Sequence, residues 1–336
     1  MVTVWFGLVV LCWVLFFVLE GFDFGVGILT PLLGRDDHER GAVVRTVGPF
    51  WDGNEVWLVA AIGVTFAAFP AWYAALLSGL YLPMVALLLL LAGRGVALEF
   101  RGKGDGIRWR RWCDGVLAAC SAGIVALWGA VLTVFLRGLP LGADGEVTGG
   151  FGRSLAPVLS PAAGVGAVLA LGAALLLGTT FLTLRTTGPV RRRARRWTIA
   201  LAVGGAAAMV AVVITGAVAA SGVGGVVGVA APVAAAVLLG VASVTRSRHE
   251  ALAFGGAALG VAAAVVTVLT AHGPVVLPST LDPAWSLTMT GAAATDSALR
   301  LLSVVGVVVL PGVLVYQAFS YWVFRRRVSS ERVSSS

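Results

Sequence analysis

Between residues 197 and 245 the chain carries no charged side chain. As one helix, at 1.5 Å per residue, this stretch would be about 73 Å long, more than twice the roughly 30 Å hydrocarbon core of a bilayer. It must therefore fold back on itself, and the glycine-rich residues 221–225 are the predicted turn. Similar apolar runs recur along the chain, of which 59% is hydrophobic and only 12% is charged. Soluble domains carry about twice that charged fraction, so an integral membrane protein is predicted.

The apolar runs predict an all-α membrane fold of about nine transmembrane helices. The helices are expected near residues 3–31, 53–69, 74–93, 115–136, 155–184, 197–220, 223–244, 250–271 and 299–324. Pro70 should end the second helix in a short hairpin at 69–73. The first run has neither the basic start nor the cleavage site of a signal peptide, so it is expected to remain as the first helix.

Lysine and arginine are unevenly distributed between the segments that join these helices. If nine helices place the C-terminus in the cytoplasm, the cytoplasmic segments hold 21 of the 24 Lys and Arg. Those segments are 32–52, 94–114, 185–196, 245–249 and the tail after residue 324. The bias supports a cytoplasmic C-terminus and an external N-terminus. The arginine run at 191–196 could suggest nucleic-acid binding, but between two membrane helices it indicates orientation and contact with anionic lipids instead.

Six ionisable residues fall within or at the ends of the first three predicted helices, in the part nearer the cytoplasm. They are Glu20, Asp23, Asp52, Glu55, Arg94 and Glu99. Because a charge at membrane depth is costly, each of them is a functional candidate. Glu20 and Asp23 are three residues apart, and so are Asp52 and Glu55. This spacing places both members of each pair on one helical face. Four carboxyl groups near one arginine would suit a proton uptake route from the cytoplasm, because burial and like charge favour protonation.

A structural interpretation of these residues also remains open. Asp52 precedes Gly53 and Asn54 at a helix start and could act as an N-cap. Arg94 could neutralise Asp23 or Glu99.

Residues that could ligate haem or a metal ion are scarce. His38, His249 and His272 fall in loops or at helix ends, without a partner at ligand spacing. Cys12 and Met209 lie inside apolar helices and are weak candidates for an axial haem ligand, better explained as packing. No metal site, no ligated cofactor and no active centre of its own is therefore predicted for this chain.

Several motifs resemble subunit II of the cytochrome bd-type quinol oxidases. The most specific are EGFDFGVG at 20–27 and PFWDGNEVWL at 49–58, which includes Trp51, Asn54 and Trp57. Weaker agreement lies in five further places. They are residues 66–70, Arg94 together with 99–101, residues 108–110, residues 278–279 together with 286–289, and residues 321–324. The agreement runs in order along nearly the whole chain, whereas the middle, about 137–275, matches only as hydrophobic helices.

The resemblance implies an architecture and a partner. It implies two four-helix bundles at 1–136 and 155–272, outer loops at 137–154 and 273–298, and a peripheral ninth helix with a basic tail at 299–336. It also implies a heterodimer, in a bacterial plasma membrane, with a subunit I that carries two b haems, haem d and the quinol site. Small accessory subunits, membrane lipids and a structural quinone are further candidate partners.

The resemblance also assigns roles to residues. The aspartate of the WDGN motif lies on a proton path in the family, which carries over to Asp52. For Asp23 and Arg94 the resemblance implies less: they would be polar groups near the same region on the cytoplasmic side. Some members have glutamine in place of Glu55, which argues against an essential role for that residue.

Two other functions compete with an oxidase subunit. In a proton-coupled secondary transporter, Asp23 and Asp52 would bind the coupling ion. Such transporters interrupt their helices at corresponding places in two repeats, whereas the acidic motifs here have no counterpart in 155–271. In a purely structural subunit, the carboxylates would serve as caps and ion pairs.

Overall fold

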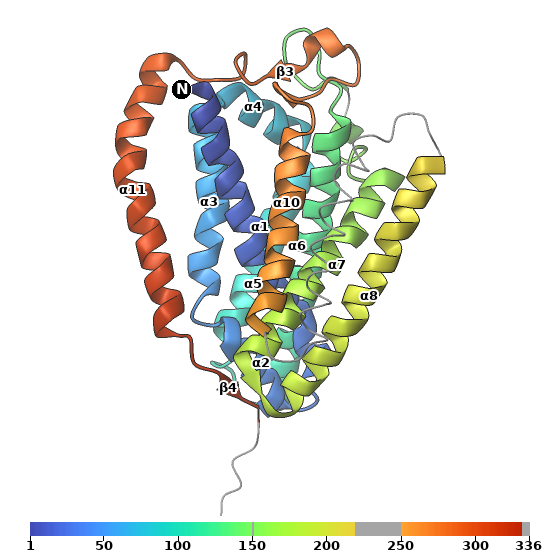
Figure 1. Cartoon of the computed structure of the whole chain (residues 1–336), viewed down its shortest axis with the longest axis vertical. Coiled ribbons are helices and arrows are strands. Elements are labelled where there is room, and N and C mark those ends of the chain that lie inside the picture. The colour runs from blue at the N-terminus through green and yellow to red at the C-terminus, as the bar shows by residue number, and fades with distance from the viewer. Residues whose placement is uncertain (150, 219–249, 331–336) are drawn as a thin grey trace, which may run out of the picture.

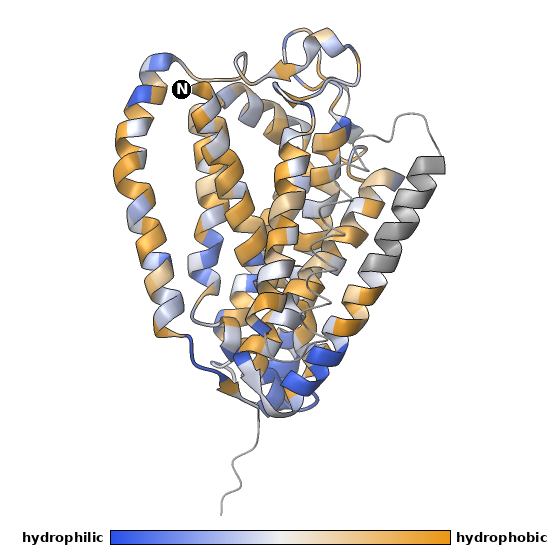
Figure 2. Cartoon of the chain, viewed as in Figure 1, coloured by the Kyte–Doolittle hydropathy of each residue, from blue (hydrophilic) through white to orange (hydrophobic). Residues whose placement is uncertain are grey.

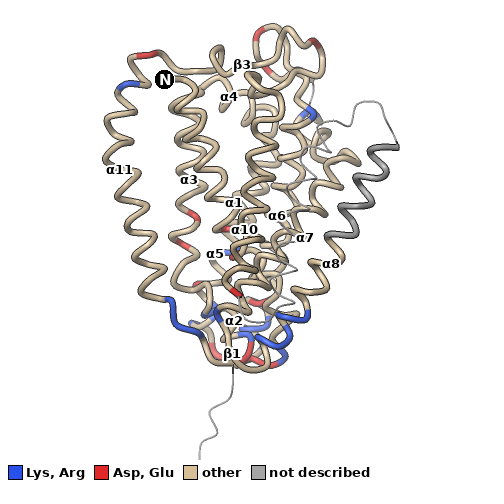
Figure 3. Tube along the Cα trace, viewed as in Figure 1, with Lys and Arg blue, Asp and Glu red and all other residues tan. Residues whose placement is uncertain are grey.

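Long helices run side by side between two chemically different ends of the molecule (Figure 1). This computed structural model describes residues 1–149, 151–218 and 250–330. Lys and Arg gather at one end, which we call the basic end (Figure 3), and the N-terminus lies at the other, which we call the cap end. The helical segments between the two ends are mainly hydrophobic (Figure 2).

Ten helices are described in full or in part. They are α1 (Val2–Leu33), α2 (Asp37–Val47), α3 (Trp51–Ala68), α4 (Pro70–Gly79), α5 (Tyr81–Phe100), α6 (Ile107–Arg137), α7 (Pro161–Arg185), α8 (Gly188–Val218), α10 (Glu250–Thr270) and α11 (Asp296–Val323). Short 3₁₀ turns, Phe151–Ser154 and Pro283–Trp285, and strands β1 (Thr186–Thr187), β2 (Val275–Leu277), β3 (Leu287–Thr288) and β4 (Val328–Ser329) complete this part of the chain.

Six of the described helices are long and apolar enough to cross a membrane, namely α1, α5, α6, α7, α10 and α11. The chain is therefore a multi-pass membrane protein, as predicted. The helix expected at 223–244 and the turn at 221–225 lie outside the described residues, so the total of nine stays a prediction.

Two predicted segment boundaries are wrong. The helix expected at 74–93 is two helices, because the chain turns at Phe69, starts α4 at Pro70 and breaks again at Leu80 before α5. Proline is well suited to the first turn of a helix, where its missing N–H has no helical partner. The segment 32–52, expected as a loop, contains α2, whose N-terminus is capped by Asp36 accepting from the Glu39 N–H at 2.8 Å. A search for long apolar runs cannot find so polar a helix.

The first and second halves of the chain meet where α1 and α6 cross α7. At Gly25 of α1, an added Cβ would lie 1.9 Å from the carbonyl oxygen of Ala174 in α7. At Gly129 of α6, an added Cβ would lie 2.4 Å from the carbonyl oxygen of Gly166 in α7. Glycines at such crossings let helix backbones approach closely, which is how helices associate in lipid.

Salt bridges tie α2 to the turn between α5 and α6 at the basic end. Asp37 accepts from Arg101 at 3.0 Å and from Arg110 at 2.6 Å, and Arg101 also donates to buried Asp114 at 2.6 Å. Burial by itself would raise the pKa of Asp37, but the hydrogen bonds and positive charges of Arg110 and Arg101 lower it below the ordinary value. Asp37 therefore stabilises the folded chain as a carboxylate.

The C-terminal segment is also attached at the basic end. Strand β4 pairs in parallel with β1, with Val328 opposite Thr186. Glu250 at the start of α10 accepts from Arg191 at 2.5 Å and from Arg327 at 2.7 Å. At the cap end, β2 pairs with β3, and Leu139 bridges to Ser279, which joins the segments before α7 and α11.

Replacing Gly25 by alanine should loosen the α1–α7 crossing. Because the new methyl group would overlap the Ala174 carbonyl, we expect the free energy of unfolding to fall by about 1–3 kcal/mol. Thermal unfolding of the purified protein in detergent measures this change. Gly7→Ala, also on α1 but with nothing within 4 Å of the new Cβ, is the matched control and should leave the unfolding temperature unchanged or slightly higher. Equal shifts in both variants would contradict the proposed close crossing.

Asp37→Asn should reduce stability at neutral pH by about 1 kcal/mol, because two charge-assisted hydrogen bonds are weakened on a side chain that is 25% exposed. The folded-state pKa is lowered, so the contribution is complete above the ordinary pKa of about 4 and is lost as the pH falls through the folded-state value. The difference in unfolding temperature between variant and native protein should therefore disappear on acidification. Asp105→Asn, an exposed acid in the neighbouring turn, should show no such pH-dependent difference.

Candidate functional site: a buried acidic cluster

A group of charged side chains lies inside the bundle where α1, α3 and α5 meet. Glu20 and Asp23 of α1 and Arg94 of α5 are at most 1% exposed, and Glu55 of α3 is 29% exposed. The helices bring them together because Glu20 and Asp23 share one face of α1. We call these four residues the acidic cluster.

Arg94 is the cation of the acidic cluster. Its Nη1 lies 3.1 Å from Oε2 of Glu20 and 3.8 Å from Oε2 of Glu55. Its guanidinium also lies over the Phe24 ring, 4.6 Å from the centroid, a favourable cation–π arrangement. One cation thus serves three acids, so the cluster carries a net negative charge when all of them are ionised.

Asp23 belongs to a hydrogen-bonded chain that ends on α11. Asn54 of α3 donates through Nδ2 to Oδ2 of Asp23 at 2.7 Å. The Asn54 Oδ1 in turn accepts from Gln317 Nε2 at 2.7 Å and from the Tyr321 hydroxyl at 2.8 Å. Phe50 stacks on Tyr321 with ring centroids 4.6 Å apart. Residues of three helices, α1, α3 and α11, therefore define the environment of one carboxyl group.

The structure does not bring Asp52 into the cluster. Asp52 is exposed in the first turn of α3, and Phe50, rather than Asp52, is the N-cap residue. No side-chain hydrogen bond caps α3, so the capping role considered for Asp52 is wrong. The carboxyl group lies at the surface of this chain, one helical turn from Glu55.

Glu99 is also separate from the cluster. It is exposed near the end of α5 and pairs with Lys103 at 3.1 Å. The expected neutralisation of Glu99 by Arg94 is therefore wrong. Arg94 forms ion pairs with Glu20 and Glu55, and its positive charge also acts on Asp23. The rotation of α5 about its axis decides this choice, and sequence spacing within one helix does not reveal that rotation.

The two tryptophans of the segment 49–58 differ in burial. Trp51 is half-buried, and its ring would lie 3.8 Å from a Cβ added at Gly95 of α5. Trp57 is 1% exposed, and its Nε1 has no hydrogen-bond partner within the described ranges.

Several polar atoms of the cluster likewise lack a hydrogen bond of good geometry to any residue that the structure describes. They are both carboxyl oxygens of Glu20, Oδ1 of Asp23, and Nε, Nη1 and Nη2 of Arg94. Buried polar groups are almost always hydrogen-bonded to protein or to water. The buried groups of the cluster therefore keep part of their hydrogen-bonding capacity unused within the described part of the chain.

Sequence reasoning missed Gln317 and Tyr321. The segment 321–324 matched the family pattern, but no role for it followed from that match. One signal was present: a glutamine in the apolar run of α11, four residues before a tyrosine, places two polar groups on one face of a membrane helix.

The donor set of the described residues does not fit a haem in this chain. Cys12 is buried in the apolar core, and His38 is exposed at the basic end. His272 is exposed, with its Nε2 3.0 Å from the carbonyl oxygen of Leu136. The side chain of Met209 and the whole of His249 lie outside the description. No three His, Cys, Asp or Glu side chains among the described residues are placed to hold a metal ion.

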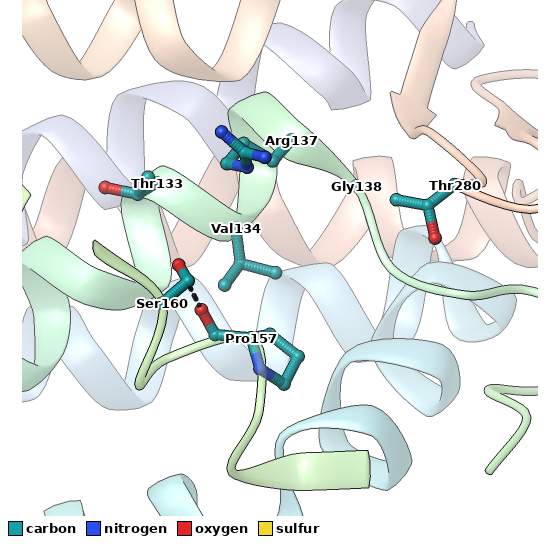
Figure 4. A pocket seen from close by; sticks show the side chains of 7 residues that line it. All are labelled: Thr133, Val134, Arg137, Gly138, Pro157, Ser160 and Thr280. Atoms are coloured by element: carbon teal, nitrogen blue, oxygen red, sulfur yellow. Dashed lines mark hydrogen bonds between the residues drawn. The ribbon is translucent and has the colours of Figure 1, made fainter. Parts of the chain in front are cut away.

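A cavity of about 200 Å³ lies at the other end of the molecule. The end of α6, the segment before α7 and the loop before β3 surround it (Figure 4). Its lining residues are Thr133, Val134, Arg137, Gly138, Pro157, Ser160 and Thr280. None of the acidic-cluster residues lines it, so the cavity and the cluster are separate features.

The fold and the cluster define the class of protein: a multi-pass membrane helix bundle with a largely buried group of acids around one arginine. Residues 1–324 match the family described as cytochrome bd terminal oxidase subunit II. The chain belongs to this family, as its motifs predicted.

Known relatives agree over almost their whole length. The chain is 38% identical over 331 residues to cytochrome bd ubiquinol oxidase subunit 2 of Bacillus subtilis, covering 97% of this chain and 96% of the relative. It is 30% identical to cytochrome bd-I ubiquinol oxidase subunit 2 of Escherichia coli K12, covering 98% and 96%. The solved bd oxidase of Geobacillus thermodenitrificans has the same fold, with a TM-score of 0.67, 18% identity and 96% coverage of both chains. The chain is therefore a subunit of a respiratory quinol oxidase and works with a partner subunit.

Removing the cation should destabilise the cluster. Arg94→Met leaves buried Glu20 without its ion pair, and we expect a loss of about 3 kcal/mol in the free energy of unfolding. Adding Glu20→Gln should recover part of that loss, because the unpaired buried charge is then removed. Thermal unfolding of the two variants measures both effects. Lys103→Met, which breaks only the exposed pair with Glu99, should cost less than about 1 kcal/mol. If Arg94→Met were as mild as Lys103→Met, the cluster would not be the buried ion pair described.

Proposed function

We propose that this chain supplies protons from the cytoplasm for the reduction of dioxygen to water and stabilises the haem-bearing partner subunit I. In this proposal the partner holds the b haems, haem d and the quinol site. The present chain holds neither haem nor metal and contributes the acidic cluster. The observation that carries the proposal is that Glu20, Asp23 and Glu55 surround a single Arg94 inside an apolar bundle.

The exposure of the acids suggests an order of transfer. Asp52 is exposed, Glu55 is 29% exposed, and Glu20 and Asp23 are fully buried. A proton entering at Asp52 would pass Glu55 and reach the buried pair next to Arg94, with water completing the steps between carboxyl groups. An excess of acids over cations favours this use, because at least one carboxyl group can take up a proton at little electrostatic cost.

The basic end is proposed to face the cytoplasm. Positively charged residues gather there (Figure 3), and the positive-inside rule places such an end in the cytoplasm. The N-terminus would then lie outside and the C-terminal tail inside, in a bacterial plasma membrane. The nine helices, the two bundles with the segment boundaries given above, the accessory subunits and a structural quinone or lipid belong to the same proposal.

The outward face of α3 is proposed as part of the contact with subunit I. Asp52, Val56, Val59, Gly63 and Phe66 are exposed and follow one another at helical spacing. Lipid alone could cover the apolar members of this stripe. An acid on the same stripe is costly against lipid, which favours a protein partner that pairs with it.

A transporter is less well supported. The acidic cluster lies entirely on α1, α3 and α5, and α7 contains no acidic residue. The two-repeat arrangement typical of coupled transporters therefore has no basis in these helices.

The proton-supply role predicts the behaviour of two aspartate variants. In the complex assembled with subunit I, Asp52→Asn and Asp23→Asn should keep the haem spectrum yet lower oxygen consumption severalfold, because an amide cannot take up and release a proton. Oxygen uptake with excess quinol measures turnover, and the absorbance of haems b and d measures assembly.

Glu99→Gln is the matched control for these variants, because Glu99 is an exposed acid outside the cluster. It should turn over at the native rate. Native turnover in both aspartate variants would favour a structural role for the subunit. Loss of the haem d absorbance would instead show that the aspartates act in assembly.

A further inference from the structure

Helix α11 is attached to the rest of the chain at only a few points. Leu299 is its one buried residue, and α11 stands at the edge of the bundle beside α3 (Figure 1). Near the cap end, Trp5 of α1 donates through Nε1 to the Leu299 carbonyl and to the Ser303 hydroxyl, both at 3.2 Å. The second attachment, nearer the basic end, runs through Gln317 and Tyr321 to Asn54. Of these two attachments, only the second is linked to the acidic cluster, through the hydrogen bond from Asn54 to Asp23.

The two contacts from α11 favour one orientation of the Asn54 amide. A carboxamide has a donor side and an acceptor side. Gln317 and Tyr321 both donate to the acceptor side, Oδ1, at 2.7 and 2.8 Å, and with these two donors in place the NH₂ group faces Asp23. Asn54 is 0% exposed, so no bulk water can compensate for the opposite orientation. A reversed amide would place its oxygen against a carboxyl oxygen of Asp23 and would require the Gln317 amide and the Tyr321 hydroxyl to turn and accept instead of donating.

We propose that Gln317 and Tyr321 are positioning residues of the proton path, which act through Asn54 on Asp23. By holding the Asn54 amide in one orientation, they keep an N–H donor on Oδ2 of Asp23 while Oδ1 stays free for proton exchange. The proposal rests on the proposed proton-supply function and adds that a helix at the edge of the bundle controls the geometry of the buried acid. Docking of α11 thus completes the site.

The alternative is that these contacts only anchor α11. The stacking of Phe50 on Tyr321, with an interplanar angle of 9°, would serve an anchor equally well. The two explanations differ in one respect: an anchor does not act through Asp23, whereas a positioning residue has no effect on turnover once Asp23 can no longer carry a proton.

The test is a double-mutant cycle in the purified complex with subunit I, assembled as judged by its haem spectrum. The variant Gln317→Leu/Tyr321→Phe removes both donors and keeps the aromatic stack. We expect it to lower kcat for quinol oxidation roughly tenfold with little change in KM, because a misoriented partner misplaces the proton-carrying group. Combined with Asp23→Asn, it should cause no further loss of kcat, because the two changes act on the same step.

Trp5→Phe/Ser303→Ala is the matched control, because it weakens the other α11 attachment without touching the cluster. It should turn over at the native rate. An equal loss of kcat in the control, or an additive loss in the Asp23→Asn background, would overturn the positioning role. If the double variant fails to assemble, Tyr321→Phe alone removes one donor, keeps the ring and undergoes the same cycle.

Failure of this inference is distinguishable from failure of the proposed function. Native kcat in both Asp23→Asn and Asp52→Asn would remove the proton-supply function and the positioning role with it. A slow Asp23→Asn together with native kcat in Gln317→Leu/Tyr321→Phe would leave the function in place and overturn the positioning role alone.

Discussion

The contact between Arg94 and Glu20 is the interaction on which the rest of the site depends. Both side chains are almost completely buried in an apolar bundle, where a lone charge would be very costly. The same guanidinium reaches Glu55 and covers Phe24, so one cation joins α1, α3 and α5. Because three acids share this cation, the cluster is both a structural connection and a place that can accept a proton.

A close helix crossing lies beside this cluster on α1. Gly21 and Gly25 alternate along α1 with Glu20 and Asp23, so the acidic face and the glycine face belong to the same two turns. At Gly25 the α7 backbone is so near that an added Cβ would overlap it. The charged site and the smallest residues of α1 are thus two parts of one arrangement: α7 closes against the glycines of α1, while α3 and α5 supply Glu55 and Arg94.

The charged candidates were found from the sequence because a charge inside an apolar run is conspicuous. Spacing also placed Glu20 and Asp23 on one face, as the structure has them. The same reasoning could not separate Asp52, which is exposed, from Glu55, one turn further along α3. It also missed Gln317, because its partner Asn54 lies 263 positions earlier in the chain. Hydrogen bonds between helices depend on how each helix is rotated about its axis, and hydrophobicity determines that rotation only coarsely.

By itself, the sequence determined that this is a helical membrane protein, where most of its helices run, and to which family it belongs. These properties follow from the length of apolar runs, the placement of arginines and local motifs, all of which can be read along one segment at a time. Only the tertiary structure decided that Arg94 pairs with Glu20 and that α11 reaches Asp23 through Asn54. Such pairings are settled by packing, because the bundle must satisfy buried polar groups within the few close crossings that its small residues allow.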